Sequence, residues 1–531
     1  PSFMFGLLVL ATDPAVNFKK YCVFNNPVLR VEADCEDQAF TPELSVKINA
    51  SLELNKTGWM YFNAESNPDL SPKEQMKAIG YAEGVLYQHH LFNHHENVKD
   101  WFLFAYLKPY TKFPDEVYAF YKDNIAWTRK QARLNRDSYW RQVAATLAHF
   151  DGMVLGYQQT APESEFMSEI ELFIYMSFGD MLDVVNFVIP KMRPQFRQRE
   201  VRELRDHCSG LVRVHKDDIF LSQSAWFTYG SMTRVAKEYR FNLGARAKYV
   251  KFSSYPGFSY SFDDWYATDT GLMYFETTNS IDDIVLYDLC SYQSLMTWIR
   301  APIAGRLAAD AEHFSTLISK YDSGTYNNQW VVVDLLEFDK QSQENVIWVM
   351  EQIPGKSASY DATERLLKTG YFPSYNIPSQ LEVRQISGYI PTETNSMNSY
   401  ENCARKKIFE RDAVRIGSVE EMRAMMRYND YLNDPFALDD NGVPEPGNAI
   451  ASRYDLRTGK TRKCFGAFDN KIGAYNRKTK LYESHFVSSP TNLQVGAWVF
   501  PDPADLYCPR RGLETGPFDH DWVVEKMHKG W

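Results

Sequence analysis

The sequence predicts an α+β protein in which helices and strands form layers around a large core. Apolar residues recur at helical spacing in the stretch that begins at residue 71, whereas they alternate as in strands after residue 208. Further helical stretches separate those strands, and this interleaving favours a layered α+β architecture over an all-β sandwich. Hydrophobic residues make up 44% of the 531 residues, enough for a large core, and we find no internal repeat.

The first part of the chain, to about residue 70, contains strand-like runs separated by turns. The apolar run from Phe3 to Ala11 is about half as long as a transmembrane helix requires, so we expect no membrane-spanning segment. This run is either the remnant of a signal peptide or a first strand. Its alternating apolar residues and the turn-like Thr12-Asp13-Pro14 that follows favour the strand.

A helical region follows these strands. Ser71 and Glu74 form a capping box with Pro72 at the first helical position, and apolar residues follow at helical spacing. Three more helices are expected: one begins at Pro114, one covers residues 137–150, and one begins near Ser168 with Glu171 three positions on. Several helices therefore precede Cys208.

The character of the chain changes at about residues 192–207. This stretch is polar and basic and lacks an apolar stripe, so we expect an exposed linker that proteases can reach. Residues 209–214 and 219–223 are expected to form a hairpin directly after it. Further strands are predicted at 249–254, 271–276, 329–338 and 346–352, and further helices at 228–239 and 289–317.

The composition excludes several classes of partner and site. A net charge of -10 without a continuous basic surface argues against nucleic acid. None of the seven cysteines forms a CxxC pair, which argues against structural zinc. An odd count leaves at least one thiol free in an oxidising compartment, and the expected bridges are Cys22 with Cys35 and Cys464 with Cys508. Glycosylation sequons at Asn49 and Asn55 are compatible with secretion.

The signatures of several common enzyme classes are missing, because the chain has no GxSxG elbow, HExxH, P-loop or GxGxxG. His90 and His94 would share a helix face at a spacing that a metal can bridge, but no acidic third ligand is placed nearby. A partly buried helix end is therefore the better interpretation, and we expect no metal or other cofactor. Residues 439–442 lack the glutamate of a calcium loop and are expected to form a turn.

Cys208 is the most informative residue. It follows the polar linker and begins an alternating strand, which is where a self-cleaving hydrolase would place its nucleophile. The alternative is a buried structural cysteine, and the local sequence alone favours that alternative.

Several segments match one known family in that family's order: residues 207–211, 226–232, 252–257, 271–278, 324–330, 371–378, 426–430, 450–456 and 516–522. From about residue 55 to its end, the chain thus resembles the phospholipase B-like proteins, the lysosomal relatives of lamina ancestor. The resemblance implies an αββα sandwich of the N-terminal-nucleophile hydrolase type, with a helical N-terminal part. It also implies a precursor cut between His207 and Cys208, which divides the chain into fragments 1–207 and 208–531 of one folded unit.

The same resemblance implies roles for individual residues. Cys208 would be the nucleophile, Trp226 a pocket residue beside it, and Thr278 a threonine near the oxyanion, with Thr277 as its close competitor. Arg411 is the best match for the active-site arginine. Two positions depart from the family pattern: Gln223 stands where relatives carry histidine, and Gln385 where they carry asparagine. Glutamine keeps an amide donor, so Gln385 is still expected to serve the oxyanion.

The expected function is hydrolysis of an acyl ester or amide bond in a lipid-like substrate, through a thioester on Cys208. Cleavage would free the Cys208 α-amino group, which can accept the thiol proton near neutral pH. The expected location is the secretory pathway, lysosomal or secreted, with transient contact to a membrane surface. Three alternatives remain: a non-catalytic lipid or glycan carrier, an amidase acting on N-acyl compounds, and a cysteine hydrolase that never self-cleaves and uses His520 or His149 as base.

Overall fold

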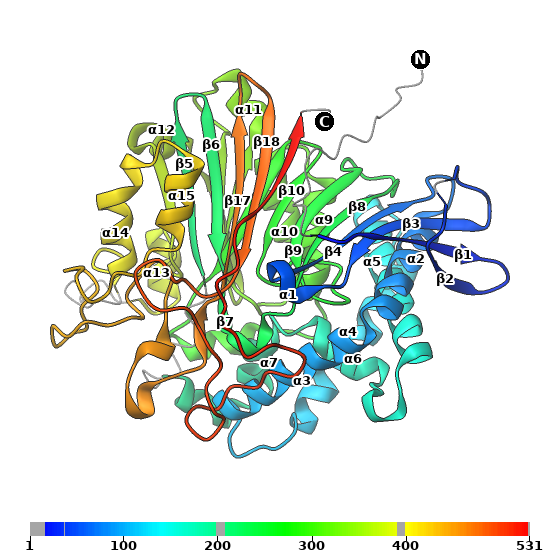
Figure 1. The fold of residues 1–531 in the computed structure, drawn as a ribbon, viewed down its shortest axis with the longest axis horizontal. Helices are drawn as coiled ribbons and strands as arrows, with labels where there is room; N and C mark the ends of the chain where they lie inside the picture. Colours follow the sequence, from blue (N-terminus) through cyan, green and yellow to red (C-terminus); the bar gives the residue numbers. More distant parts are fainter. Residues whose placement is uncertain (1–15, 37, 198–207, 390–398, 529–531) are drawn as a thin grey trace.

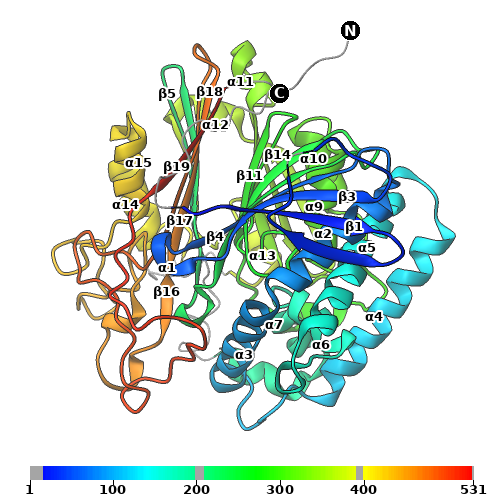
Figure 2. The same cartoon turned by 45° about the vertical axis from the view of Figure 1, so that its right-hand side comes forward.

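The structure is a computed structural model that describes residues 16–36, 38–197, 208–389 and 399–528. The strand predicted at residues 3–11, most of the linker and His207 lie outside these ranges. The protein has the mixed α+β architecture that the sequence predicts, with two large sheets and helices on their outer faces (Figures 1 and 2).

The larger sheet has eleven strands, and it joins the parts of the chain before and after Cys208. All neighbouring pairs are antiparallel except β4 and β8, which run parallel with Trp59 opposite Arg234. The spatial order is β14 (Lys356–Asp361), β13 (Ile347–Ile353), β12 (Asn328–Asp334), β11 (Leu272–Thr278), β10 (Trp265–Thr268), β9 (Tyr249–Ser254), β8 (Arg234–Arg240), β4 (Trp59–Ser66), β3 (Leu44–Ser51), β1 (Lys19–Asn25) and β2 (Leu29–Ala33).

The smaller sheet has six antiparallel strands, in the order β15 (Tyr371–Ser374), β5 (Ser209–His215), β6 (Asp218–Ser224), β17 (Asp469–Asn476), β18 (Leu481–Ser488) and β19 (Val523–His528). A two-stranded ribbon pairs β7 (Trp226–Thr228) with β16 (Phe465–Ala467). The two large sheets pack face to face, since Val212 and Leu221 of the smaller sheet share a buried cluster with Phe275 and Val331 of the larger one. Gly210 permits this approach, because a Cβ there would overlap the Phe275 ring.

Helices cover the outer face of each sheet (Figure 2). The apolar sides of α2 (Pro72–Leu86), α5 (Ser138–Thr160), α9 (Thr297–Leu307) and α10 (Ala311–Ile318) pack into the core beneath the larger sheet. On the smaller sheet, α14 (Ala404–Asp412) and α15 (Val419–Met426) cover β5, β6 and β17. The remaining helices are α1 (Leu54–Thr57), α3 (Gln88–Ala105), α4 (Asp115–Leu134), α6 (Glu169–Met176), α7 (Met181–Val188), α11 (Leu335–Lys340), α12 (Thr363–Thr369) and α13 (Leu381–Ile386).

Helices α2 and α5 pack unusually closely. Glycines at positions 80 and 84 of α2 face glycines at 152 and 156 of α5, and a Cβ at any of the four would overlap backbone atoms of the other helix. The absence of side chains therefore lets the two backbones touch.

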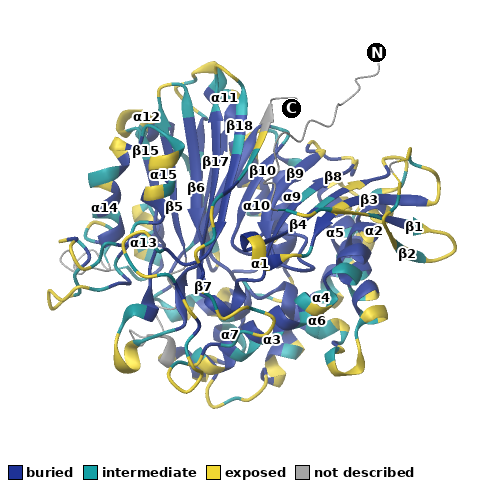
Figure 3. Cartoon of the chain, viewed as in Figure 1, coloured by how far each residue is buried: buried dark blue, intermediate teal, exposed yellow. Residues whose placement is uncertain are grey.

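Most predicted elements are confirmed. Ser71 and Ser168 each form a complete capping box, with Glu74 and Glu171 respectively. Strands β5 and β6 form the predicted hairpin. The third predicted helix is longer than expected and ends at Thr160. Figure 3 shows that the central strands are buried throughout, so many of them lack the alternation of a half-exposed strand.

Three element predictions are wrong in whole or in part. The helical stretch predicted at residues 289–317 begins only at Thr297, and residues 308–310 separate its two helices, α9 and α10. Residues 228–239, expected to be a helix, form the end of β7, a short 3-10 turn and strand β8. Strand β8 lies inside the larger sheet, where ion pairs allow even Arg234 and Lys237 to be buried. Because buried and charged positions coincide, the sequence of β8 does not show the apolar–polar alternation of a strand. The strand predicted to end at residue 338 ends at Asp334, whose carboxylate accepts the N–H groups of Leu336 and Glu337 and thereby begins helix α11.

Both expected disulfides are present, Cys22–Cys35 and Cys464–Cys508, and Cys208, Cys290 and Cys403 are free. The sequon residues Asn49 and Asn55 are exposed. Within the described ranges, no helix is both long and apolar enough to cross a bilayer.

Candidate active site

Cys208 lies at the N-terminal end of β5, with its side chain 3% exposed. The next residue, Ser209, pairs with Ser224 at the end of β6, so Cys208 lies beside the chain that continues through Ala225 and Trp226. The backbone φ of Cys208 is 99°. Because a non-glycine residue rarely adopts this conformation, the site stores strain at the residue that follows the predicted cleavage point.

A cavity of about 60 Å³ lies next to Cys208. Within the described ranges, the only charged residues in its wall are two acids, Asp183 and Asp263, and its polar wall residues include Thr278 and Asn279. Half of the described wall residues are aromatic: Phe102, Tyr106, Phe178, Trp226, Phe227, Tyr255, Phe262 and Tyr326. This arrangement suits an apolar group held against the cysteine sulfur.

The surroundings of the thiol favour its protonated form. Burial raises the pKa of the Cys208 thiol well above its usual value, and the nearby Glu276 carboxyl raises it further. The backbone N–H of Trp226 hydrogen-bonds the sulfur, and this contact and the charge of Lys471 both lower the pKa. A buried thiol of this kind needs a base in direct contact to become a nucleophile.

Arg405, from α14, connects Cys208 and strand β5 to their neighbours. Its Nη1 donates to the main-chain carbonyl of Cys208 at 2.6 Å and to Oδ1 of Asn376 at 2.8 Å. Its Nη2 donates to the carbonyl of Tyr375 at 3.0 Å, and the guanidinium lies 4.4 Å from the centre of the Trp226 ring. Asn376 in turn donates to the carbonyl of Thr278 at 2.7 Å, which ties β11 to the same group.

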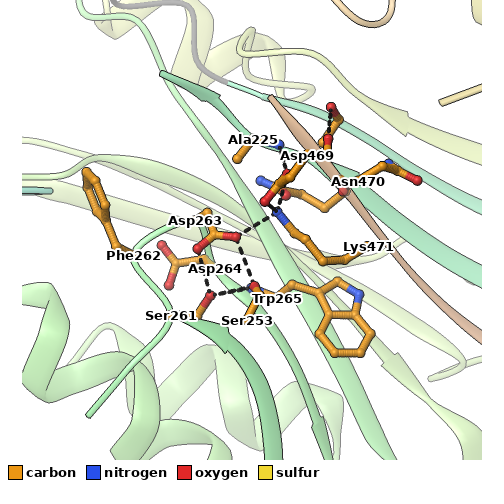
Figure 4. A network of polar contacts seen from close by, with 12 residues as sticks. Ala225, Ser253, Ser261, Phe262, Asp263, Asp264, Trp265, Asp469, Asn470 and Lys471 are labelled. Atoms are coloured by element: carbon orange, nitrogen blue, oxygen red, sulfur yellow. Dashed lines mark hydrogen bonds and ion pairs between the residues drawn. The ribbon is translucent and has the colours of Figure 1, made fainter. Parts of the chain in front are cut away.

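A buried cluster of two acids and two bases lies behind the cavity, part of it visible in Figure 4. Asp263 and Arg234 come from the larger sheet and its connections, whereas Asp469 and Lys471 come from β17 of the smaller one. Two ion pairs cross between the sheets, Arg234 Nη2 to Asp469 Oδ2 at 2.9 Å and Lys471 Nζ to Asp263 Oδ2 at 2.7 Å. Burial by itself would raise the pKa of the Asp263 carboxyl. The positive charges of Arg234 and Lys471 have the larger effect and hold this pKa below its usual range.

A second acidic group lies close to the thiol. Glu276 is buried on β11, where Tyr326 donates to its Oε1 at 3.1 Å and Thr278 to its Oε2 at 3.4 Å. Burial raises the pKa of Glu276 to about 8. Burial and the neighbouring Glu276 also raise the pKa of Asp264 well above its usual value.

The structure brings some of the predicted site residues together. Cys208, Trp226 and Thr278 all line the cavity. Gln223 is fully buried on β6 and donates to the carbonyl of Glu276 at 3.4 Å. Thr277 is buried behind the wall, where its hydroxyl lies 2.7 Å from that of Ser374.

Two predicted residues lie elsewhere. Gln385, on α13, is exposed and does not line the cavity. Arg411 also lies outside the wall, and Asp412 and Asp434 hold its guanidinium. The arginine that contacts Cys208 is Arg405, six positions earlier. Sequence reasoning missed Arg405 and Asn376, although Asn376 lies in one of the family segments; no local signal separates the two arginines of this basic stretch.

Among the residues that the structure describes, no histidine lines the cavity. His149 lies in a separate buried cluster with Glu83 and Tyr239, and Nδ1 of His520 lies 2.8 Å from the carbonyl of Ser488. His94 stacks on Tyr255 with ring centres 4.5 Å apart, and Tyr175 lies 3.0 Å from its Nδ1. In the part of the chain that the structure describes, no group of three or more potential ligands is arranged to hold a metal.

Comparison with known proteins establishes the family. The family model described as Phospholipase B matches residues 49–524, which is most of the chain. The chain belongs to the phospholipase B family. This confirms the resemblance predicted from the sequence segments.

Individual members of the family are similar over most of their length. Phospholipase B-like protein C of Dictyostelium discoideum is 31% identical over 499 residues, which cover 89% of this chain and 85% of that protein. Phospholipase B-like 1 of Rattus norvegicus is 32% identical over 456 residues, covering 82% and 80%. Phospholipase B of Crotalus adamanteus is 30% identical over 474 residues, covering 84% and 83%.

Proposed function

We propose that this protein is a phospholipase B-type acyl hydrolase with the N-terminal-nucleophile fold, and that Cys208 becomes its nucleophile when the His207–Cys208 bond is cut. The observation that supports this most is the position of Cys208: a free, buried thiol at the start of the inner strand β5, in a cavity wall of which half the described residues are aromatic. The pairing of two sheets between helical layers agrees with that fold.

Self-cleavage would begin with attack of the Cys208 sulfur on the carbonyl carbon of His207. The peptide C–N bond breaks, the acyl chain moves to sulfur as a thioester, and the nitrogen takes up a proton. Water then hydrolyses the thioester, which leaves a carboxylate on His207 and restores the thiol. The strained φ of Cys208 favours this reaction, because cutting the bond releases the strain.

The cut also supplies the missing base. The new α-amino group is bonded to the same residue as the thiol and has an ordinary pKa of about 7.7 to 8.0, so it can accept the thiol proton near neutral pH. This explains how a buried thiol with a raised pKa becomes reactive although no histidine is found among the described residues of the cavity wall. Residues 1–207 and 208–531 would stay together, because β4 and β8 pair within one sheet.

Substrate hydrolysis would repeat this chemistry on a foreign acyl group. The sulfur attacks the acyl carbonyl, the α-ammonium gives its proton to the leaving oxygen or nitrogen, and water releases the acid from the thioester. The backbone N–H of Trp226, which contacts the sulfur, is the donor we propose for charge that develops there. Gln385 is exposed, so an oxyanion role for it would require α13 to move.

A lipid-like acyl compound is the substrate we propose. The names of the relatives refer to phospholipase B, and the aromatic cavity wall suits an apolar chain. The proposed location is the secretory pathway, lysosomal or secreted, which two disulfides and the exposed sequon residues Asn49 and Asn55 support.

Acyl-group turnover tests the proposal. Purified protein is incubated with a phosphatidylcholine, a lysophosphatidylcholine and an N-acyl amide, and Cys208 is examined for an acyl adduct by mass spectrometry after acid quenching. We expect hydrolysis of at least one substrate by the wild type and none by Cys208→Ala. The matched control is Cys290→Ala, a buried free thiol outside the cavity, which should keep the activity. Retention of lipid without turnover would instead indicate a carrier.

A further inference from the structure

Asp469 lies beside Ala225, the residue before Trp226 (Figure 4). Its Oδ1 accepts the backbone N–H of Ala225 at 2.9 Å, and its main-chain carbonyl accepts the Ser224 hydroxyl at 2.7 Å. The next N–H along the chain is that of Trp226, which lines the same cavity wall as Cys208 and Ala225. A hydrogen bond from this N–H lowers the pKa of the Cys208 thiol. Asp469 thus hydrogen-bonds both Ser224 and Ala225, the two residues that precede Trp226.

The buried ion cluster fixes Asp469 in turn. Lys471, two positions on along β17, therefore projects from the same face of the strand, and its Nζ lies 2.8 and 3.0 Å from the two carboxylate oxygens of Asp469. Arg234 approaches from the larger sheet at 2.9 Å. All three side chains are at most 2% exposed, so water does not weaken these contacts.

We propose that Asp469 is a positioning residue for the nucleophile: by holding Ala225, it aims the Trp226 N–H at the Cys208 sulfur. This inference rests on the proposed role of Cys208. An N–H donated to sulfur stabilises the thiolate relative to the thiol, so its aim sets how readily the thiol loses its proton. The carboxylate acts through the Ala225 peptide and touches neither sulfur nor substrate.

Two paired variants isolate the hydrogen bond from the charge. Asp469→Asn with Lys471→Met and Asp469→Leu with Lys471→Met both remove one charge of each sign. They differ in a single feature, because asparagine keeps an oxygen that can accept the Ala225 N–H and leucine does not. The readout is the pH dependence of Cys208 alkylation by iodoacetamide, followed by peptide mass spectrometry, with thermal unfolding measured in parallel.

We expect the midpoint of the alkylation profile to lie about one pH unit higher in the leucine pair than in the asparagine pair, which is about a tenfold slower reaction below the midpoint. Equal midpoints in the two pairs would overturn the inference. Asp455→Asn is the matched control, since Asp455 is a buried aspartate paired with Arg453 outside the cavity, and it should leave the midpoint unchanged.

If the leucine pair does not fold, Ser224→Ala provides a milder test, because it removes the hydroxyl that binds the Asp469 carbonyl. A midpoint above that of the wild type supports the inference, and an unchanged midpoint contradicts it. Alkylation does not require turnover. A wild type that hydrolyses no substrate would therefore count against the proposed function, while the midpoints would still decide the role of Asp469.

Discussion

Arg405 Nη1 lies 2.6 Å from the main-chain oxygen of Cys208, and the same guanidinium lies 4.4 Å from the centre of the Trp226 ring. One cation thus contacts both Cys208, the proposed nucleophile, and Trp226. Because a planar guanidinium donates in several fixed directions, lysine cannot replace it at such a position.

Arg405→Lys should reduce the fraction of chains cut at residue 208 and the rate of acyl transfer, because the carbonyl of Cys208 and Oδ1 of Asn376 lose a shared donor. Each buried acceptor left without a partner costs about 1–3 kcal/mol. The comparison is Arg411→Lys on the same helix, whose side chain contacts Asp412 and Asp434 outside the cavity and should permit normal cleavage. Quantitative gel analysis of both variants checks this, and equal losses in the two would exclude a special role for Arg405.

Gly152→Ala should lower the free energy of unfolding by about 1–3 kcal/mol or more, because the added Cβ overlaps the carbonyl of Lys77 across the α2–α5 contact. Gly496→Ala is the control, since open space surrounds that position and its φ is ordinary. Denaturant unfolding measures both. If Gly152→Ala were as stable as the control, the two helices would not pack as closely as described.

Glu276→Gln should change how stability depends on pH. The folded-state pKa of Glu276 is about 8, raised above the ordinary 4.5 by burial. The stability that its protonated form contributes is therefore complete below pH 4.5 and is lost as the pH rises through about 8. Relative to Glu276→Gln, the wild type should lose stability across this window. Unfolding curves of both proteins at several pH values test this, and a constant difference between them would show that Glu276 is not held protonated.

The sequence predicts those elements whose ends depend on interactions between residues close together in the chain. Ser71 with Glu74 and Ser168 with Glu171 mark helix starts because capping involves residues three positions apart. Strand β8 was missed because its charged residues are buried by partners far away in sequence: Arg234 pairs with Asp263 and Asp469, and Lys237 with Glu83. No window of adjacent residues contains that information.

The residues of the candidate site fall into the same two groups, those that the local sequence predicts and those that only the fold brings together. Cys208 and Trp226 were found because contiguous family segments contain them, and both line the cavity. Arg405 and Asp469 reach the same place from a helix and a strand that lie 197 and 244 residues along the chain from the residues they contact. A single sequence does not rank Arg405 above Arg411, because both lie in one short basic helix and only the fold decides which of them faces β5.

The most direct test of self-cleavage before Cys208 is the chemical identity of the chain end at position 208. Protein made in a secretory host is analysed by intact mass and amino-terminal sequencing, together with Cys208→Ala and the control Cys290→Ala. Self-cleavage by Cys208 predicts a fragment that begins at Cys208 in the wild type and in the control, and an uncut 207–208 bond in Cys208→Ala. A wild-type protein that hydrolyses acyl substrates while this bond stays intact, or a Cys208→Ala protein that is cut at the same bond, would contradict it.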